Sequence, residues 1–252
     1  MSTISVYTTT YNAIEYDYCP IEGIKSALQF SDEVIVIDSC STDGTVESIR
    51  AIGDDRIKIY SIDWLESIGW AMNKISRSMG IGRCTKDWCI LMDADEVFHE
   101  KDYDRIKMLS ETSPKEVIGI KFNTLHFYVD YDHVLNGYSG WKDLYTNKIY
   151  MVRNGLGIHH GNSGMDIDAQ VDRHGIPLNH KFITYYGVDV FHYGHVRSEE
   201  AYLKKQNRMH SFYSGCIVNE TSIKKIDLNS LNLFVGSHPE TMRTKIENKK
   251  HM

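Results

Sequence analysis

Three apolar segments of this chain each lead into side chains that could bind or transform a ligand. The first is followed by Tyr11, the second closes on Asp38, and the third is followed by the pair Asp93 and Asp95. A tyrosine ring and a single carboxylate suit a nucleoside base, which can stack on the ring and hydrogen-bond to the carboxylate. Two neighbouring carboxylates repel phosphates, so they need a divalent cation as a bridge. These segment ends therefore predict a nucleoside diphosphate site with Mg²⁺ or Mn²⁺ as cofactor.

The segments that must position these residues alternate between strand and helix patterns. Apolar β-branched runs predict strands, and helical spacing with capping residues predicts the helices between them. Such a βαβαβαβ order predicts an α/β fold with a mostly parallel sheet, which binds ligands at the carboxyl ends of its strands. In chain order the predicted elements are strand Ile4–Thr9, a helix from Pro20, strand Glu33–Asp38, helix Thr45–Ile52, strand Arg56–Ser61, helix Ser67–Met79 (stopped by Gly80-Ile81-Gly82) and strand Asp87–Met92.

The second half of the chain is less regular. Strands are predicted at Glu116–Tyr128, Lys148–Arg153 and Tyr186–Tyr193, and Ser198 is expected to cap a helix. We expect one catalytic domain over residues 1–215, with a nucleotide-sugar-binding half at 1–100 and an acceptor-binding half at 101–215. Residues 216–252 form a polar tail for which both a helix and partial disorder stay open.

Composition excludes several classes of protein. The 252 residues suffice to bury a sizeable core, and no apolar run reaches the ~20 residues of a membrane helix. The 28 Lys and Arg against 34 Asp and Glu give a net charge of −6, which argues against a broad phosphate-tracking surface. The N-terminus lacks the pattern of a signal peptide. Five cysteines without a C-x-x-C pair predict reduced, mostly buried thiols and a cytoplasmic protein.

Several segments resemble the glycosyltransferases of family 2. Val34–Thr45 is similar to the second-strand motif of that family, and Asp87–Glu96 is similar to its D-x-D strand. Gly69–Asn73 is similar to the helix before the D-x-D strand, and Tyr11 after the first strand fits the same pattern. Phe191–Arg197 resembles the end of the catalytic region in small soluble members.

The resemblance implies the GT-A fold, a Rossmann-like and mostly parallel sheet flanked by helices, with a smaller antiparallel region on the acceptor side. It also implies transfer of a sugar from a nucleotide-sugar donor to an acceptor hydroxyl, dependent on Mn²⁺ or Mg²⁺ and usually with inversion. A UDP-sugar is the favoured donor. The acceptor stays open among a glycan, a lipid carrier, a protein, a small molecule and a modified nucleic acid, and an oligomer is compatible with the sequence.

The same resemblance suggests roles for individual residues. GT-A enzymes often supply a late histidine as a further metal ligand, and His192 at the end of a strand is preferred over His195 for this role. The expected nucleotide-sugar-binding residues are Thr9, Tyr11, Asp38, Asn73 and Asp93, and the expected metal ligands are Asp95 and His192.

An inverting transfer needs a carboxylate that deprotonates the acceptor hydroxyl. Asp166 follows a glycine-rich loop that could line a cleft, so it is the preferred base, with Asp168, Asp143 and Asp189 as alternatives. Trp141 is expected either to stack on a sugar ring or to pack in the core.

Two other functions stay open at this level. One is nucleotidyl transfer that makes activated sugars, although its glycine-rich loop after the first strand is missing here. The other is a nucleotide- or glycan-binding module without turnover. A calcium loop starting at Asp93 is disfavoured because Phe98 would stand where glycine is required. His159 and His160 are expected in a solvated loop.

Overall fold

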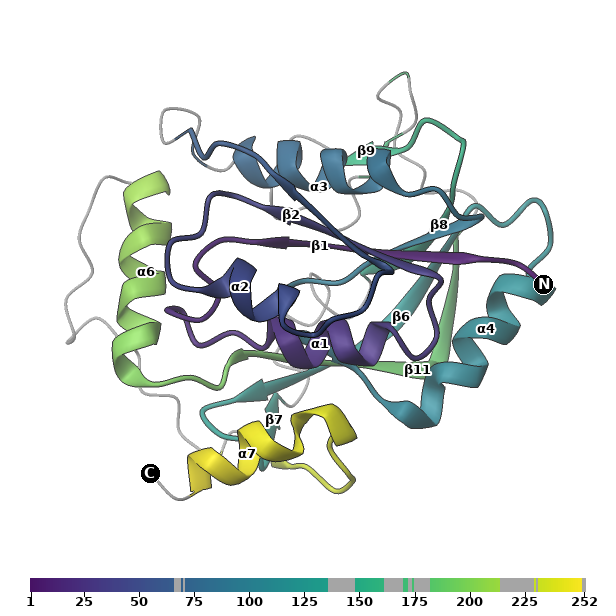
Figure 1. Cartoon of the computed structure of the whole chain (residues 1–252). Coiled ribbons are helices and arrows are strands. Elements are labelled where there is room, and N and C mark those ends of the chain that lie inside the picture. Colours follow the sequence, from purple (N-terminus) through teal and green to yellow (C-terminus); the bar gives the residue numbers. More distant parts are fainter. Residues whose placement is uncertain are drawn as a thin grey trace.

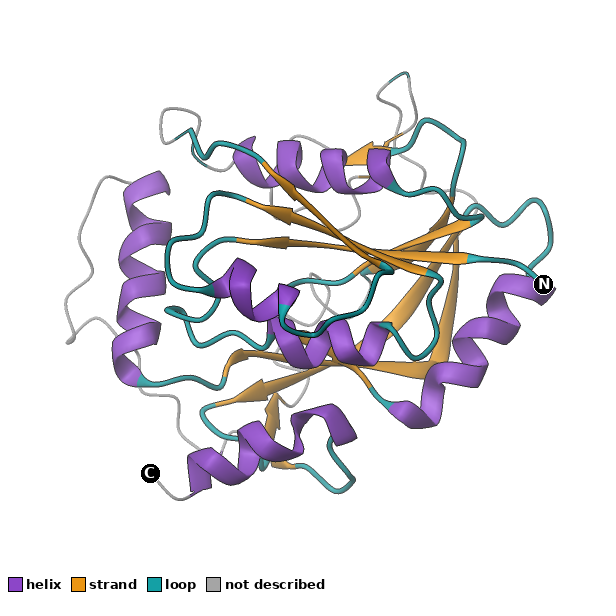
Figure 2. Cartoon of the chain, in the orientation of Figure 1, coloured by secondary structure: helices purple, strands orange, loops and turns teal. Residues whose placement is uncertain are grey.

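The computed structural model describes residues 1–65, 69, 71–135, 148–160, 170–171, 174, 182–213, 229 and 231–250. Its centre is a twisted sheet with helices on both faces (Figures 1 and 2). Four parallel strands lie in the order β3-β2-β1-β4. Their bounds are β1 Ile4–Thr10, β2 Glu33–Asp38, β3 Ile57–Ser61 and β4 Trp88–Leu91.

The sheet continues beyond β4 in mixed directions. β8 is antiparallel to both β4 and β6, and β6 leads through β7 to β12. β11 lies parallel to β6 and antiparallel to β5. The bounds are β5 Glu96–Phe98, β6 Gly119–Tyr128, β7 His133–Leu135, β8 Ile149–Arg153, β11 Phe182–His195 and β12 Leu231–Leu233, with a separate pair β9 His159–His160 and β10 Gln170–Val171.

The helices cover this sheet in two layers. α1 and α2 lie in front of the sheet in Figure 1, and α3 lies above the sheet in that view, against β1 and β2 and beside β9. α6 stands on the side toward which β1 and β2 point. The bounds are α1 Pro20–Ala27, α2 Thr45–Arg50, α3 Ala71–Arg83, α4 Tyr103–Thr112, α6 Glu199–Tyr213 and α7 Arg243–Lys250, with 3₁₀ turns at Glu100–Asp102 and Glu240–Met242.

Alternating side chains on β1 and β2 explain why both faces are covered. Val34 and Val36 pack into one buried cluster with residues of α1, whereas Ile35 and Ile37 pack into a second cluster with residues of α3. All four side chains are fully buried. A strand that is apolar on both faces belongs in the middle of a sheet with helices on each side. The predicted α/β architecture and its parallel first half are therefore confirmed.

One helix boundary was predicted wrongly. Gly80 and Gly82 do not stop α3, which begins at Ala71 and runs to Arg83; the expected start at Ser67 lies outside the described residues. A Cβ on Gly80 would lie only 2.8 Å from Tyr7 Cδ2. Gly80 therefore lets α3 approach β1 closely, and the helix accepts the modest cost of glycine in its interior.

The C-terminal residues that are described pack onto the second half of the sheet. β12 pairs with β7, and Met242 and Ile246 are buried in a third apolar cluster beside Phe127 and Phe191. Figure 1 shows α7 against this end of the molecule. Residues 231–250 are thus built onto the same sheet as the strand ends described below.

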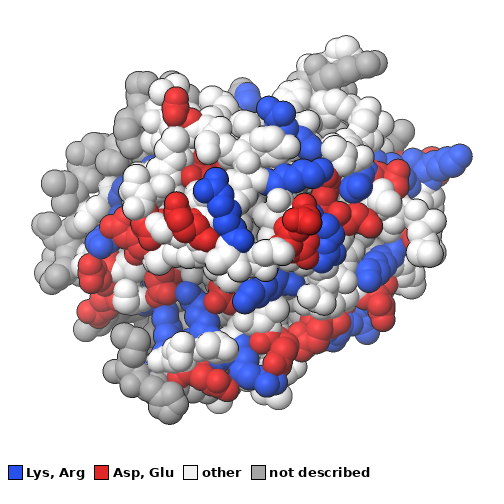
Figure 3. Space-filling model, viewed as in Figure 1, with Lys and Arg blue, Asp and Glu red and all other residues white. Residues whose placement is uncertain are grey.

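Three further features of the described residues concern membrane spans, surface charge and cysteines. No helix among the described residues is long and apolar enough to cross a bilayer. Acidic and basic side chains are interspersed over the face seen in Figure 3, with no broad patch of one sign. Among the described cysteines, all of which are free thiols, Cys19, Cys84 and Cys89 are buried and Cys40 is exposed.

Candidate active site at the carboxyl ends of the strands

The ends of β1 and β2 lie side by side, because Thr10 is paired with Asp38 in the parallel register. Asp38 is 1% exposed and its carboxylate accepts three hydrogen bonds. Thr10 Oγ1 and Ser41 Oγ donate to Oδ1 at 2.8 and 2.6 Å, and the Ser41 backbone N–H donates to Oδ2 at 2.8 Å. In this structure Asp38 holds the turn after β2 in shape, directly beside the first strand end.

Tyr11 lies in an aromatic group at the end of β1. Its ring centroid lies 5.5 Å from that of Trp64 and 6.3 Å from that of Tyr16. The Arg208 guanidinium of α6 lies 3.5 Å from the Tyr11 ring centroid. The Tyr11 ring, which we expected to stack on a nucleoside base, therefore already packs beside two aromatic rings and under the Arg208 cation of α6.

Thr9 and Asn73 are both half-buried. Thr9 is paired with Ile37 of β2, one residue before the strand ends. Asn73 lies in the first turn of α3, and its carbonyl accepts a hydrogen bond from Ser76 Oγ at 3.3 Å.

Asp93 follows β4 and is held between two cations. Arg77 Nη2 lies 2.7 Å from its Oδ1, and Lys148 Nζ lies 2.7 Å from its Oδ2. Burial alone would raise the pKa of Asp93, but Arg77 and Lys148 outweigh it and lower the pKa to about 2. Both carboxylate oxygens are therefore engaged, so Asp93 is poorly placed to ligate a cation directly.

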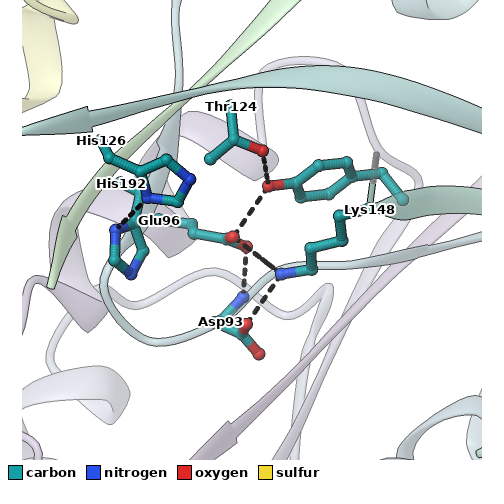
Figure 4. Close-up of a pocket in the computed structure, with 7 residues that line it drawn as sticks. Asp93, Glu96, Thr124, His126, Lys148 and His192 are labelled. Carbon is teal, nitrogen blue, oxygen red and sulfur yellow. Dashed lines mark hydrogen bonds and ion pairs between the residues drawn. The ribbon is translucent and has the colours of Figure 1, made fainter. Parts of the chain in front are cut away.

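Lys148 and Glu96 form a buried charge cluster that the sequence reasoning missed. Lys148 Nζ contacts the two Glu96 oxygens at 2.7 and 2.8 Å, and the Tyr150 hydroxyl donates to Glu96 Oε1 at 2.8 Å. Burial is the main cause that raises the pKa of Glu96, and Asp93 adds to it. Figure 4 shows these groups around a small cavity of about 30 Å³. Its lining residues are Asp93, Glu96, Thr124, His126, Lys148, Tyr150 and His192.

Asp95 faces a different set of groups. His192 Nε2 lies 3.5 Å from Asp95 Oδ2, and Arg197 Nη2 lies 3.7 Å from the same oxygen. Lys205 Nζ of α6 lies 4.0 Å away. Burial would raise the pKa of Asp95, but His192, Lys205 and Arg197 hold it well below its ordinary value. The carboxylate is therefore ionised at neutral pH.

The pair Asp95 and His192 fits a divalent cation. An oxygen and an imidazole nitrogen 3.5 Å apart are spaced like neighbouring ligands of one ion, and this donor set suits Mn²⁺. A Cβ on Gly194 would lie 2.5 Å from both Asp95 Oδ2 and His192 Nε2, so glycine keeps the space between them open. No group of three or more His, Cys, Asp or Glu in the described part of the chain is arranged as a complete site. Donor phosphates and water would have to supply the remaining ligands.

His192 is oriented by a second histidine. His126 of β6 is its neighbour in the β6–β11 register, and the two Nδ1 atoms lie 3.0 Å apart (Figure 4). His195, the competing candidate, stacks on Tyr128 with ring centroids 4.4 Å apart. Burial lowers the pKa of His195 well below its usual range, so this ring is neutral.

The candidates for the base fall in two groups. Asp166, Asp168, Asp143 and the possible sugar-stacking Trp141 lie outside the described residues. Asp189 is described: it pairs with Lys101 at 2.9 Å and accepts a hydrogen bond from Asn123 at 2.7 Å. Asn123 and Thr124 are adjacent on β6 and point to opposite faces, so Asp189 lies on the face away from the cavity.

The expectation that His159 and His160 lie in a solvated loop was wrong for His160. These residues form β9, and His160 is 6% exposed. Its Nε2 lies 2.9 Å from the Tyr7 hydroxyl. Burial, with Arg77 as a further cause, lowers the pKa of His160 to about 3, so it is a neutral partner within the core.

A known protein family matches the part of the chain that contains the strand ends of the site. Residues 5–160 match the family described as glycosyl transferase family 2. This range contains the ends of β1, β2 and β4 together with Lys148.

Curated relatives agree with that match, and a solved structure has a similar fold. The chain is 33% identical over 87 residues to an uncharacterized glycosyltransferase of Rickettsia typhi, an alignment that covers 34% of this chain and 27% of the relative. It is 27% identical over 108 residues to the succinoglycan biosynthesis protein ExoO of Rhizobium meliloti, covering 43% of this chain and 29% of ExoO. S. aureus TarS 1–349 in complex with UDP has a similar fold, with a TM-score of 0.53, 16% identity, and coverage of 87% of this chain and 68% of TarS. The chain thus matches less than a third of the length of these two relatives.

Proposed function

The chain belongs to glycosyl transferase family 2, and on that premise we propose that it transfers a sugar from a nucleotide-sugar donor to an acceptor hydroxyl. The observation that carries the proposal is the arrangement at the strand ends. Asp95, which follows β4 in the strand position next to β1, faces His192 across an opening kept clear by Gly194. An ionised carboxylate next to an imidazole is suited to an ion that carries a diphosphate.

In this proposal the donor nucleotide lies along the ends of β1 and β2. Tyr11 contributes an aromatic face, and Thr9 and Asn73 line the approach. Asp38 would bind the base through the turn whose shape it holds, since both of its oxygens already accept hydrogen bonds from Thr10 and Ser41. Asp93 would act on the donor indirectly, because its carboxylate holds the Arg77 and Lys148 side chains in place. S. aureus TarS has been solved with UDP and with UDP-GlcNAc, which supports UDP-sugars as the first donors to test.

Asp95 and His192 are the residues that would hold Mn²⁺ or Mg²⁺. The cation would neutralise the negative charge that develops on the leaving diphosphate. The acceptor oxygen would attack the anomeric carbon while the bond from that carbon to the diphosphate oxygen breaks, so the configuration inverts. The hydroxyl proton would pass to a carboxylate, for which we propose Asp166.

Release of nucleoside diphosphate tests this function. Purified protein is incubated with UDP-glucose, UDP-N-acetylglucosamine or GDP-mannose, with Mn²⁺ and then with excess chelator. We expect turnover of at least one donor with Mn²⁺ and its loss in chelator. Asp95→Asn should abolish the Mn²⁺-dependent turnover, whereas Asp104→Asn, an exposed carboxylate on α4, should match the parent. Full turnover in excess chelator would overturn the metal assignment.

The base is tested separately from the donor site. Asp166→Asn keeps the size of the side chain but removes the proton acceptor, so the rate should fall by roughly 10²–10⁴-fold. Donor affinity, measured by calorimetry with Mn²⁺, should stay unchanged. Near-normal turnover in this variant would move the base to Asp168 or Asp143, since Asp189 lies on the face away from the cavity.

The free thiols also support a reducing, cytoplasm-like compartment for the protein, since buried unpaired cysteines suit such surroundings. Fractionation of the source cells tests this, and recovery from an oxidising compartment would contradict it.

A further inference from the structure

Arg197 lies just before α6 and has unused hydrogen-bonding capacity. Its side chain is 0% exposed, yet its Nε and Nη2 atoms have no hydrogen-bond partner among the described residues. Buried guanidinium N–H groups without an acceptor are costly, and in folded proteins such groups are normally paired with a protein atom, an ordered water or a bound ion. The two atoms therefore need an acceptor that the described residues do not supply.

The guanidinium is held in place by two other contacts. Arg197 Nη1 donates to the Tyr16 carbonyl at 2.8 Å, and the guanidinium carbon lies 4.3 Å from the Tyr18 ring centroid. Lys205 Nζ shares the same ring, 5.3 Å from its centroid. An aromatic face and a carbonyl therefore fix the Arg197 and Lys205 cations beside each other before any ligand arrives.

Among the described residues, the positive charge of Arg197 and Lys205 exceeds the negative charge of the carboxylate that they contact. Asp95 is the carboxylate that they share, and its Oδ2 lies 3.7 Å from Arg197 Nη2 and 4.0 Å from Lys205 Nζ. Both distances are longer than a hydrogen bond. Asp17 does not balance the excess, because it is paired with Lys245 and Lys249 of α7.

The missing acceptor is best matched by a diphosphate. With a divalent cation at Asp95, the charges of Arg197, Lys205 and the ion would exceed that of the Asp95 carboxylate by about three. A nucleoside diphosphate carries about three negative charges at neutral pH, so it would balance this excess. α6 stands on the side to which β1 and β2 point (Figure 1), and its Lys205 lies 4.0 Å from Asp95, so a diphosphate carried by an ion at Asp95 would lie within reach of α6.

We propose that Arg197 and Lys205 bind the donor's diphosphate directly, alongside the ion held by Asp95 and His192. This inference rests on the proposed function, because it assumes that the diphosphate belongs to the donor. It adds a consequence of its own: part of the diphosphate binding is independent of metal. The leaving diphosphate therefore has two sources of positive charge, one fixed by the chain and one supplied by the ion.

Calorimetric titration in excess chelator tests the proposal, with UDP, UMP and inorganic pyrophosphate as probes. The parent should bind UDP and pyrophosphate without metal, and UDP more tightly than UMP. Lys205→Gln and Arg197→Gln should each weaken UDP and pyrophosphate by about tenfold or more and reduce the difference between UDP and UMP. Arg197→Lys keeps the charge and should retain part of the affinity.

Lys204→Gln is the matched control. Lys204 is the neighbour of Lys205 on α6, but it pairs with Glu15 and Glu200 at the surface. Lys204→Gln removes the same charge as Lys205→Gln, and it should leave the affinities for UDP, UMP and pyrophosphate at the parent value. Thermal melting checks that Arg197→Gln folds. If Arg197→Gln does not fold, Lys205→Gln alone decides the test, because the Lys205 side chain is 20% exposed and its replacement should be tolerated.

The outcomes separate this inference from the proposed function. Unchanged affinity for UDP and pyrophosphate in Lys205→Gln, and in Arg197→Gln if that variant folds, would overturn the inference while leaving the function standing. If no donor is turned over but pyrophosphate binds and is lost in these variants, the function fails and the anion site stands. A parent that binds neither UDP nor pyrophosphate in chelator overturns the inference.

Discussion

Gly194 is the residue that keeps Asp95 and His192 within reach of one ion. A Cβ at this position would lie 2.5 Å from the facing atom of each side chain. We expect Gly194→Ala to push the two apart and to weaken Mn²⁺-dependent donor binding by about 10- to 100-fold, the range seen when the support of a metal ligand is disturbed. Calorimetry with and without Mn²⁺ measures this effect.

Gly187→Ala is the matched control on the same strand. Its Cβ would meet the Tyr185 ring at 2.8 Å, so it is also crowded, but it lies away from Asp95. The Mn²⁺-dependent donor binding of this variant should therefore stay at the parent value. Equal loss in both variants would show that Gly194 acts through the stability of β11 alone.

Glu33 is a buried carboxylate whose contacts stabilise the fold. Ser5 Oγ and Thr85 donate to its Oε1, and Lys58 Nζ lies 2.8 Å from its Oε2. Burial alone would raise the pKa of Glu33, but Lys58, Ser5 and Thr85 outweigh it and lower the pKa from 4.5 to about 2. These contacts join β1, β2, β3 and the turn before β4.

A lowered folded-state pKa means that Glu33 stabilises the fold above its unfolded pKa. Its contribution should be complete above about pH 4.5 and should disappear as the pH falls toward 2. Glu33→Gln should cost on the order of 3 kcal/mol at pH 7 and flatten the acid limb of the stability curve. Urea unfolding between pH 3 and 7 measures this, and parallel curves for parent and variant would contradict it.

At the scale of elements, the contact between α3 and β1 depends on Gly80. Gly80→Ala would place a Cβ 2.8 Å from Tyr7 Cδ2, with Tyr7 fully buried. Overpacking of this kind costs about 1–3 kcal/mol. Gly82→Ala, on the same helix with nothing within 4 Å of the new Cβ, should instead stabilise by up to about 1 kcal/mol. Urea denaturation of both variants should give effects of opposite sign.

At the scale of the molecule, the C-terminal segment is expected to unfold together with the central sheet. Met242 is 0% exposed and packs with Phe127, Phe191 and Tyr193 from β6 and β11. Met242→Ala should cost about 2–5 kcal/mol and lower a single unfolding transition. Met108→Ala, at a 44% exposed position of α4, should change little. A separate early transition in the parent would contradict this expectation.

Local patterns sufficed for much of the architecture and for part of the site. The run Glu33–Asp38 is apolar on both faces, which only a central strand tolerates, and the observed β2 has the same bounds. Because parallel strands present their carboxyl ends at one edge, the residues at or just after each strand's end predicted one common region for Tyr11, Asp38 and the Asp93–Asp95 segment.

Packing between distant segments decided the rest. Lys148 follows Asp93 by more than fifty positions, and nothing near it in the chain marks it as the cation that engages Asp93 and Glu96. The same holds for His126 beside His192 and for Arg197 and Lys205 beside Asp95, which come together through the β6–β11 pairing and the position of α6. A single sequence records which charges exist, but the charge that each one meets depends on tertiary contacts. In a buried site those contacts determine which carboxylate is neutralised by the chain and which is left for a ligand.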